Sequence, residues 1–284
     1  MTTSLTLGTR IQRIRKRRAV LQRMIRTDLS VKYEGSTLGY FWSVLEPLLM
    51  TGVYWLVFGL IGRLGRVQPF PPYILSGILA WQWMSASFTG SMRTLRGNSK
   101  LISKIGDLPR EIYPMQLVLT KGIEFLITIS VLVPVAFAFG LRPSLYMFYL
   151  PLAIVLQLML LTGLSLGLSA ANTLLRDLER VSRPVLRAWF YLSPVLYPLI
   201  LVDERASSLA QTLYRLNPMT GILTLHRSAW SGWTMRPRGG GAVATVSQFD
   251  SWLTVGYSAI GCALILVIGY LLFTRLEPRV LKEI

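Results

Sequence analysis

The sequence predicts an all-α integral membrane protein with six transmembrane helices, an N-terminal amphipathic interface helix and short re-entrant helices before the last span. Three observations support this prediction. The mean hydropathy is +0.48 and 52% of the residues are hydrophobic, as in chains dissolved in lipid. Several apolar runs reach the roughly 20 residues that a helix needs to cross a bilayer. Charged residues make up only 15% of the chain and gather between these runs.

Residues 1–33 are predicted to form a cytoplasmic amphipathic helix that precedes a transmembrane domain over 34–284. Apolar residues recur there at helical spacing, and arginine and lysine fill much of the remainder. The apolar positions are Leu7, Ile11, Ile14, Leu21 and Ile25. A cationic helix of this kind favours the anionic cytoplasmic leaflet of a membrane. The alternative interpretation is a basic tail that only sets the topology.

Six apolar spans follow. They cover residues 38–61, 71–92, 112–140, 146–174, 185–202 and 252–274. An even number of spans places both termini on the same side of the membrane. With the termini inside, the inner segments hold 21 lysines and arginines, counting Arg187 at the start of the fifth span with them, and the outer segments hold 8, while Lys121 falls within the third span. Because basic residues concentrate on the cytoplasmic side, we expect both termini in the cytoplasm.

The outer segment before the last span, residues 203–251, is long. Its first part, 209–233, is moderately apolar but too short and too polar for an ordinary pair of spans. Two short re-entrant or interfacial helices fit it better, and protein or a watery cavity would have to shield their backbone. The second part, 236–246, contains three consecutive glycines and is expected to be flexible.

Glu46 is an acidic residue in the first predicted span, followed directly by Pro47. A carboxylate is costly against lipid, so it should face the bundle, water or a hydrogen-bond donor. A functional and a structural role of Glu46 are both open, because Pro47 leaves one backbone carbonyl of the helix without its N–H donor, and nearby polar groups can compensate for the lost hydrogen bond.

Aromatic residues are dense in the first and fifth predicted spans. Some must be ordinary interface anchors, and packing explains any single one of them. As a set they also suit a passage for a polysaccharide, because the CH faces of sugar rings pack on aromatic faces. The candidate lining, together with Glu46, is Tyr40, Phe41, Trp42, Tyr54, Trp55, Phe58, Trp189, Phe190, Tyr191 and Tyr197.

Two inner segments connect the spans. In the first, Asn98 is expected to cap a short helix that presents Leu101, Ile102 and Ile105 to the cytosol, where a soluble partner is the natural ligand. The second, 175–184, reads LRDLERVSRP. It pairs Asp177 with Arg180 and Glu179 with Arg183 at helical spacing, as in a solvated helix extension.

Several common chemistries are absent from the sequence. No GxxxxGK[S/T] phosphate loop occurs, so the chain is not expected to hydrolyse ATP. His226 is the only histidine, and no HExxH pattern or dense aspartate cluster exists, so we assign no metal site and no catalytic residue. The single cysteine, Cys262, excludes a disulfide within one chain. Membrane topology explains the net charge of +17 better than nucleic-acid binding does.

Three separated stretches resemble the ABC-2 type permeases that export O-antigen, capsule, teichoic acid and related polymers. The first begins at Arg26 and reads RTDLSVKYEGSTLGYFW, with LEPLL following from Leu45. The second begins at Asn98 and reads NSKLISKIGDLPREIYP. The third combines ANTLLRDLER from Ala171, FYLSPVLYP from Phe190 and LNPMT from Leu216.

The resemblance implies a homodimer whose subunits enclose a channel, each bound to a separate ATPase subunit that holds ATP and Mg²⁺. It also implies that the N-terminal helix and the helix near Asn98 touch this ATPase, and that the re-entrant helices lie near the exit. No cofactor is expected in the chain itself. The residues that it marks for ATPase coupling are Asn98, Ser99, Lys100, Leu101, Ile102, Lys104, Ile105, Arg110 and Glu111.

The function expected from this resemblance is a permease subunit in the bacterial cytoplasmic (inner) membrane that moves a lipid-linked cell-envelope polymer outward. Its expected partners are two copies of the ATPase, a second copy of itself, the polymer and membrane lipids. One alternative is an ABC-2 exporter of a small molecule or drug. A membrane glycosyl- or phosphotransferase is a further alternative, but the 13 acidic residues are too dispersed to form an obvious metal or diphosphate site.

Overall fold

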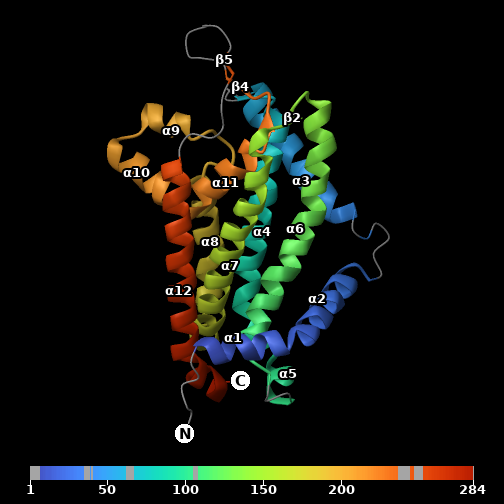
Figure 1. Cartoon of the computed structure of the whole chain (residues 1–284), viewed down its shortest axis with the longest axis vertical. Helices are drawn as coiled ribbons and strands as arrows, with labels where there is room; N and C mark the ends of the chain where they lie inside the picture. Colours follow the sequence, from blue (N-terminus) through green and yellow to red (C-terminus); the bar gives the residue numbers. More distant parts are fainter. Residues whose placement is uncertain are drawn as a thin grey trace.

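The computed structural model describes residues 7–34, 39, 41–61, 67–104, 108–235, 244–245 and 252–283. These residues form a helical bundle with small β-sheets at one end (Figure 1). We call the end with α1, α5 and the last turns of α12 the lower end, and the opposite end the upper end. The helices are α1 Leu7–Lys16, α2 Arg18–Tyr33, α3 Phe41–Tyr54, α4 Phe70–Gly97, α5 Ser99–Lys104, α6 Ile112–Ala138, α7 Tyr149–Leu174, α8 Leu178–Tyr191, α9 Ile200–Arg205, α10 Ser208–Leu216, α11 Pro218–Ser228 and α12 Trp252–Glu283.

Short irregular elements complete the chain. A π-helical stretch over Trp55–Ile61 continues α3, and a 3-10 turn over Leu145–Phe148 leads into α7. At the upper end, antiparallel strands pair in the order β1-β4-β5, and β2 pairs antiparallel with β3. The strands are β1 Val67–Gln68, β2 Arg142–Pro143, β3 Trp230–Ser231, β4 Thr234–Met235 and β5 Ala244–Thr245.

Helix α4 is the centre of the bundle, where it packs against α3, α6, α7, α8 and α11. Prolines in its first turn suit a helix start, because they lack only an N–H that the helix would leave unpaired. Most of its residues are buried, and they form the main hydrophobic core with α7 and α11. Two amides of α7 tie the helices together: Gln157 Nε2 donates to the carbonyl of Ala80 and Asn172 Nδ2 to that of Met92, each at 2.8 Å.

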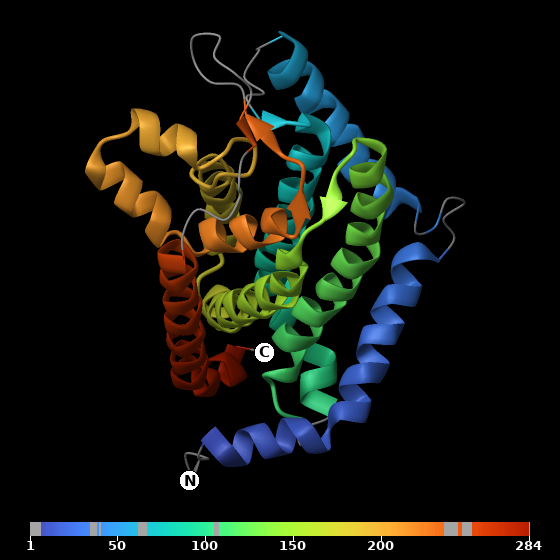
Figure 2. The ribbon, with the colours of Figure 1, turned by 45° about the horizontal axis from the view of Figure 1, so that its top comes forward.

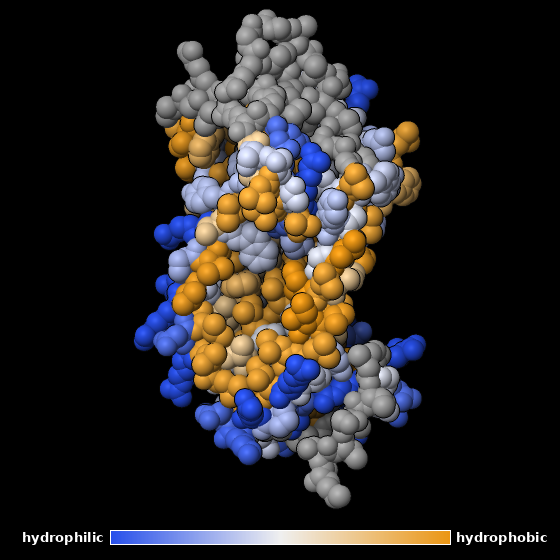
Figure 3. Space-filling model, turned by 90° about the vertical axis from the view of Figure 1, so that its left-hand side faces the viewer, coloured by the Kyte–Doolittle hydropathy of each residue, from blue (hydrophilic) through white to orange (hydrophobic). Residues whose placement is uncertain are grey.

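Four helical segments are long and apolar enough to cross a membrane: Phe41–Gly59, Ile112–Ala138, Leu145–Leu174 and Trp252–Val280. The structure therefore confirms the prediction of an all-α, multi-pass membrane protein. Apolar side chains form a broad band on the surface in Figure 3, with hydrophilic residues at its lower end and along its left margin. Helix α4 matches the second predicted span but is more polar than these four, because neighbouring helices shield it from lipid.

The fifth predicted span, 185–202, is wrong in its bounds. Helix α8 begins earlier, at Leu178, and ends at Tyr191, after which the chain makes a turn before α9. Pro194 and Pro198 lie in this turn, and neither can donate a backbone hydrogen bond that would continue the helix. Hydropathy alone does not detect the turn, because its Val195, Leu196 and Leu199 are buried apolar residues.

The N-terminal segment forms two helices where one was predicted. The chain bends between α1 and α2, at Arg17, and Figure 2 shows α1 along the lower edge with α2 rising beside α6. Ile14, Val20, Leu21 and Met24 pack against a second, smaller hydrophobic cluster at the lower end. Tertiary contacts of the apolar stripe therefore set the angle between the two helices.

An ion network fixes α1 to the bundle. Arg10 Nη1 lies 2.7 Å from Glu111 Oε1, just before α6, and 2.9 Å from Glu277 Oε2 on α12. Arg110 Nη1 lies 3.0 Å from the other oxygen of Glu277. The side chain of Glu111 is only 4% exposed, so the network is shielded from water. Burial lowers the pKa of Arg10, but its hydrogen bonds to both glutamates outweigh this effect and raise it.

Replacing Arg10 with glutamate should detach α1 from the bundle. The change places a third carboxylate beside Glu111 and Glu277, and breaking a shielded ion pair in this way costs roughly 2–4 kcal/mol. Hydrogen exchange of residues 7–16 should become faster. Arg13→Glu is the matched control, because Arg13 is exposed on the same helix. Equal exchange rates in the two variants would contradict the assigned role of the network.

The segment before the last helix contains short helices, as predicted, with local caps. Ser207 Oγ accepts from the N–H of Ala210 at 3.4 Å, and Asn217 Oδ1 accepts from the N–H of Met219 at 3.1 Å. Helix α11 is buried along almost its whole length, whereas α10 has no buried residue. The glycine-rich part, 236–246, lies outside the described residues except for 244–245.

Candidate functional site

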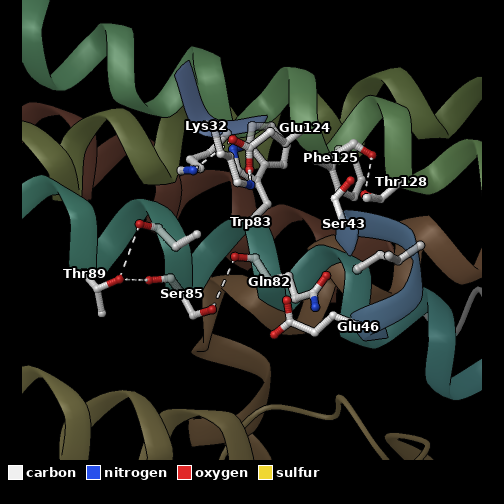
Figure 4. Close-up of a pocket in the computed structure, with 13 residues that line it drawn as sticks. Lys32, Ser43, Glu46, Gln82, Trp83, Ser85, Thr89, Glu124, Phe125 and Thr128 are labelled. Atoms are coloured by element: carbon white, nitrogen blue, oxygen red, sulfur yellow. Dashed lines mark hydrogen bonds and ion pairs between the residues drawn. The ribbon is translucent and has the colours of Figure 1, made fainter. Parts of the chain in front are cut away.

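A polar pocket of about 340 Å³ lies between α2, α3, α4 and α6 (Figure 4). Trp83 and Phe125, with ring centroids 4.9 Å apart, give it an apolar wall. Carboxylate, amide and hydroxyl groups on helices that are otherwise apolar provide sites for hydrogen bonds to a hydroxyl-rich ligand. The polar residues that line the pocket are Lys32, Ser43, Glu46, Gln82, Ser85, Thr89, Lys121, Glu124 and Thr128.

Glu124 of α6 connects two lysines in this pocket. Its carboxylate lies 2.8 Å from Lys32 Nζ of α2 and 2.9 Å from Lys121 Nζ of its own helix. Lys121 is the basic residue that falls within the third predicted span, and this contact compensates its charge in an apolar region. The same contact attaches α2 to the side of the bundle, together with the hydrogen bond from Gln116 to Asp28.

Glu46 faces polar groups, as its position in an apolar span predicted. Its side chain lines the main pocket, where Figure 4 shows it beside Gln82. It also lines a smaller cavity of about 310 Å³ with Lys32, Trp42 and Ser43. One turn beyond Pro47, Thr51 Oγ1 donates to the carbonyl of Pro47 at 2.7 Å, as helical threonines commonly do, but this bond does not replace the one that the proline removes, which would have ended at the carbonyl of Ser43.

Sequence reasoning missed the polar stripe on α4, which consists of Gln82, Ser85 and Thr89. Ser85 Oγ donates to the carbonyl of Gln82 at 3.3 Å, and Thr89 Oγ1 donates to that of Ser85 at 2.8 Å. These bonds use the hydroxyl protons and leave the oxygen lone pairs of two pocket-lining residues free to accept hydrogen bonds. The signal was present in the sequence, because these residues recur at helical spacing in a span that is otherwise apolar.

The structure brings several of the predicted aromatic residues together in one cluster. Tyr54 lies 6.3 Å from Phe190 between ring centroids, so the first and fifth predicted spans do meet. Two further members come from α4 and were not predicted: Trp81 lies 5.4 Å from Phe190, and Phe88 lies 6.3 Å from Trp189. A cavity of about 350 Å³ adjoins the cluster, and its aromatic lining is Phe58, Phe70, Phe190, Tyr191 and Tyr197.

The other predicted lining residues lie apart from this cluster. The side chains of Phe41 and Trp55 point outward and are 54% and 41% exposed. Trp42, which is 51% exposed, lines the smaller cavity beside Glu46. Tyr40 lies outside the described residues. The uncovered part of α3 is therefore an apolar and aromatic surface.

The predicted docking helix is oriented differently from our expectation. Ile102 is buried in the lower hydrophobic cluster and Leu101 is partly buried against it, so both residues stabilise the fold, while the contact of α5 with the ATPase stays a prediction. Lys100 and Lys104 form the exposed side of α5. Ile105 lies outside the described residues, and Arg110 and Glu111 belong to the network around Arg10 and Glu277.

Asn98 does not cap α5, contrary to our prediction. Its side chain Nδ2 donates backward to the carbonyl of Thr94 at 2.8 Å, so it closes the end of α4. Helix α5 then begins at Ser99. The carbonyl of Asn98 accepts from the N–H groups of both Leu101 and Ile102 at 2.9 Å.

The second inner segment confirms one predicted ion pair and corrects the other. Asp177 lies 3.5 Å from Arg180, as expected. Glu179 pairs with Arg93 of α4 instead of Arg183, because packing of α8 on α4 brings this partner close, and Arg93 Nε donates to Glu179 Oε1 at 2.6 Å.

The fold and these sites define a multi-pass helical membrane protein with polar and aromatic surfaces around α3, α4 and α8, and comparison with known proteins identifies its family. Residues 19–229 match the model of the ABC-2 type transporter family. The chain belongs to this family, whose members are the membrane subunits of transporters.

Curated relatives cover most of the chain. An O-antigen export system permease protein RfbA from Klebsiella pneumoniae is 32% identical over 209 residues, which are 73% of this chain and 78% of that protein. A protein of the same name from Myxococcus xanthus is 31% identical over 212 residues, which are 74% of this chain and 80% of that protein.

Proposed function

We propose that this chain is the permease subunit of an ABC exporter that moves a lipid-linked cell-envelope polysaccharide across the bacterial cytoplasmic membrane. The observation that supports this most is the similarity, over about three quarters of the chain, to proteins named for O-antigen export. The pocket chemistry agrees with such a substrate. Its carboxylates, amide and hydroxyls suit sugar hydroxyls, and the aromatic cluster suits the apolar faces of sugar rings.

The proposed topology has six crossings with the lower end in the cytoplasm. Four crossings are the apolar helical segments, and α4 and α8 are the other two. Helix α4, with 28 residues, is about 42 Å long and exceeds the hydrocarbon thickness of about 30 Å. Helix α8, with 14 residues, spans about 21 Å, so the turn that follows it completes the crossing. The bias of lysine and arginine toward the inner segments supports this orientation even without the four arginines between 176 and 187, because the remaining inner count is 17 (21 minus 4) against 8 outside.

The short helices have proposed membrane positions as well. Helix α1 has basic residues in its last turn and lies across the lower end, which suits the surface of an anionic leaflet. Helices α10 and α11 dip into the outer leaflet as re-entrant elements. Burial of α11 among α4, α7 and α12 gives its backbone the shielding that such an element needs.

Two copies of the chain are proposed to enclose the passage, and each copy binds one ATPase subunit. The uncovered apolar and aromatic face of α3 and the π-helical turns after it supports a partner subunit there, because only 11% of an 18-residue stretch within Phe41–Gly59 is buried in the single chain. ATP and Mg²⁺ belong to the ATPase. Movement of the ATPase would be transmitted to the helical bundle through α5 and the ion network around Arg10.

The exposed lysines of α5 test the contact with the ATPase. Lys100→Glu combined with Lys104→Glu should weaken co-purification of the ATPase about tenfold, because both residues face outward at the lower end. Membrane insertion and the melting temperature should stay unchanged. Leu101→Asp is less specific than its sequence position indicates, because Leu101 packs on the lower cluster and its change also affects the fold. Unchanged co-purification of the double variant would remove α5 from the proposed interface.

Deletion of the gene tests the function itself. Export predicts that surface polysaccharide disappears, that lipid-linked polymer accumulates inside the cell, and that the intact gene restores both. A small-molecule exporter would leave surface polymer unchanged and alter drug sensitivity. A transferase would abolish a sugar transfer measured in isolated membranes. Either of these outcomes contradicts the proposal.

A further inference from the structure

Helix α8 and the turn before it expose a row of arginines that belongs neither to the polar pocket nor to the aromatic cluster. Four arginines recur at positions i, i+4, i+7 and i+11, and all four are exposed. Arg176 lies in the turn just before α8, and the other three lie on the helix, where at 100° per residue they fall within a sector of about 60°. We call Arg176, Arg180, Arg183 and Arg187 the arginine stripe.

The stripe is distinct from the other two faces of α8. Ser182 and Leu186 are buried, and Trp189 packs edge-on against Trp81 and Phe88 of α4. Val181 and Val185 form a separate apolar face and are 51% and 44% exposed. A helix with three such faces fits a boundary where protein, lipid and a polar medium meet.

Acidic residues compensate only the lower part of the stripe. Asp177 pairs with Arg180, and Glu179 is held by Arg93 of α4. Within the part of the chain that the structure describes, no ion pair involves Arg183 or Arg187. These two arginines lie one and two turns above Glu179, so the excess positive charge increases toward the middle of the bundle.

Position and charge together indicate an anionic ligand. An arginine between the leaflets must face water or protein, because lipid chains do not solvate it. A second copy of α8 cannot cover the stripe by itself, since twofold symmetry would oppose two identical rows of positive charge. Phospholipid headgroups remain at the membrane surface, whereas the helical part of the stripe rises roughly 10 Å from Arg180 to Arg187.

We propose that the arginine stripe binds the phosphate or diphosphate ester that links the glycan to its lipid, and guides it along α8. This proposal rests on the proposed export function. Guanidinium groups suit the ligand, because they form paired hydrogen bonds to phosphate oxygens and stay charged at every physiological pH. The aromatic cluster above the stripe then receives the attached sugars.

A binding experiment with the full chain in phosphatidylcholine nanodiscs tests the stripe. The probe is farnesyl diphosphate, and farnesol is the uncharged comparison. Arg183→Gln with Arg187→Gln should weaken probe binding at least about tenfold. The matched control is Arg275→Gln with Arg279→Gln on α12, which removes two exposed arginines at the same spacing near the same end. Unchanged binding in the stripe variant, or equal loss in both variants, overturns the proposal.

Two further measurements exclude other ligands and a folding defect. Equal binding of farnesol, or displacement of the probe by an equal concentration of phosphatidylglycerol, overturns the assignment to the linking phosphate. A photoreactive lipid diphosphate applied to the unmutated chain should label α8, and labelling confined to other helices overturns the proposed binding by the stripe.

The gene deletion described above separates this proposal from the proposed export function. Normal surface polymer after deletion contradicts export and leaves phosphate binding to the stripe intact.

Discussion

Gly269→Leu is expected to abolish folding of the bundle, because α7 and α12 touch at this glycine. A Cβ atom at Gly269 would lie 1.9 Å from the carbonyl oxygen of Gly163, and one at Gly163 would lie 2.5 Å from the carbonyl oxygen of Ile265. Backbone atoms cannot move aside as a flexible side chain can, so even Gly269→Ala should cost about 1–3 kcal/mol or more. Size-exclusion chromatography and the melting temperature in detergent measure the effect.

The same helix supplies a control for this prediction. Gly256 also belongs to α12, but apart from its chain neighbours and the nearby backbone of its own helix, no atom of the described residues lies within 4 Å of the position of its Cβ. Gly256→Ala should therefore be neutral or raise stability by about 0.5–1 kcal/mol, because alanine favours helix more than glycine does. If Gly256→Ala and Gly269→Ala lowered the melting temperature equally, close packing at Gly269 would not be the cause.

Arg227→Met is expected to destabilise the upper part of the bundle by roughly 2–4 kcal/mol. Arg227 of α11 is 3% exposed, and its two Nη atoms donate to the carbonyls of Pro194 and Val195 at 2.7 Å each. Its guanidinium also lies 3.8 Å from the centroid of the Tyr73 ring. Methionine fills the space but leaves both carbonyls without these donors, so the turn after α8 should loosen. Proteolysis within residues 192–199 should become faster.

Two other substitutions show whether this arginine acts through its paired donors. Arg227→Lys should have an intermediate effect, because an ammonium group keeps the charge but lacks the planar fork. Arg215→Met on the neighbouring α10 is the control. Arg215 makes a more exposed contact with Asp203 at 2.9 Å, and such pairs contribute only about 0–1 kcal/mol. A normal melting temperature for Arg227→Met would show that the cost of burying the charge equals the gain from its bonds.

Several residues of the candidate site could be predicted from sequence pattern, but the residues of other helices that complete it could not. The prediction that Glu46 faces polar groups came from the cost of a carboxylate in lipid, and the pocket contains it. Tyr54 and Phe190 were identified by aromatic density, and they do meet. Their partners Trp81 and Phe88 were missed, because density within one span does not show which helix packs alongside it.

The sequence by itself determined that the chain is a helical membrane protein, because hydropathy and helix length depend only on local composition. It also predicted most helix ends to within a few residues. Only the tertiary structure decided the break at Arg17, the turn after Tyr191 and the partners of Glu179, Ile102 and Asn98. The contacts of Glu179 and Ile102 join residues far apart in the chain, whereas Asn98 bonds to Thr94 one turn away, a choice between two local caps that residue spacing does not decide. Local periodicity specifies which residues share a helix face, but packing alone selects the group that this face meets.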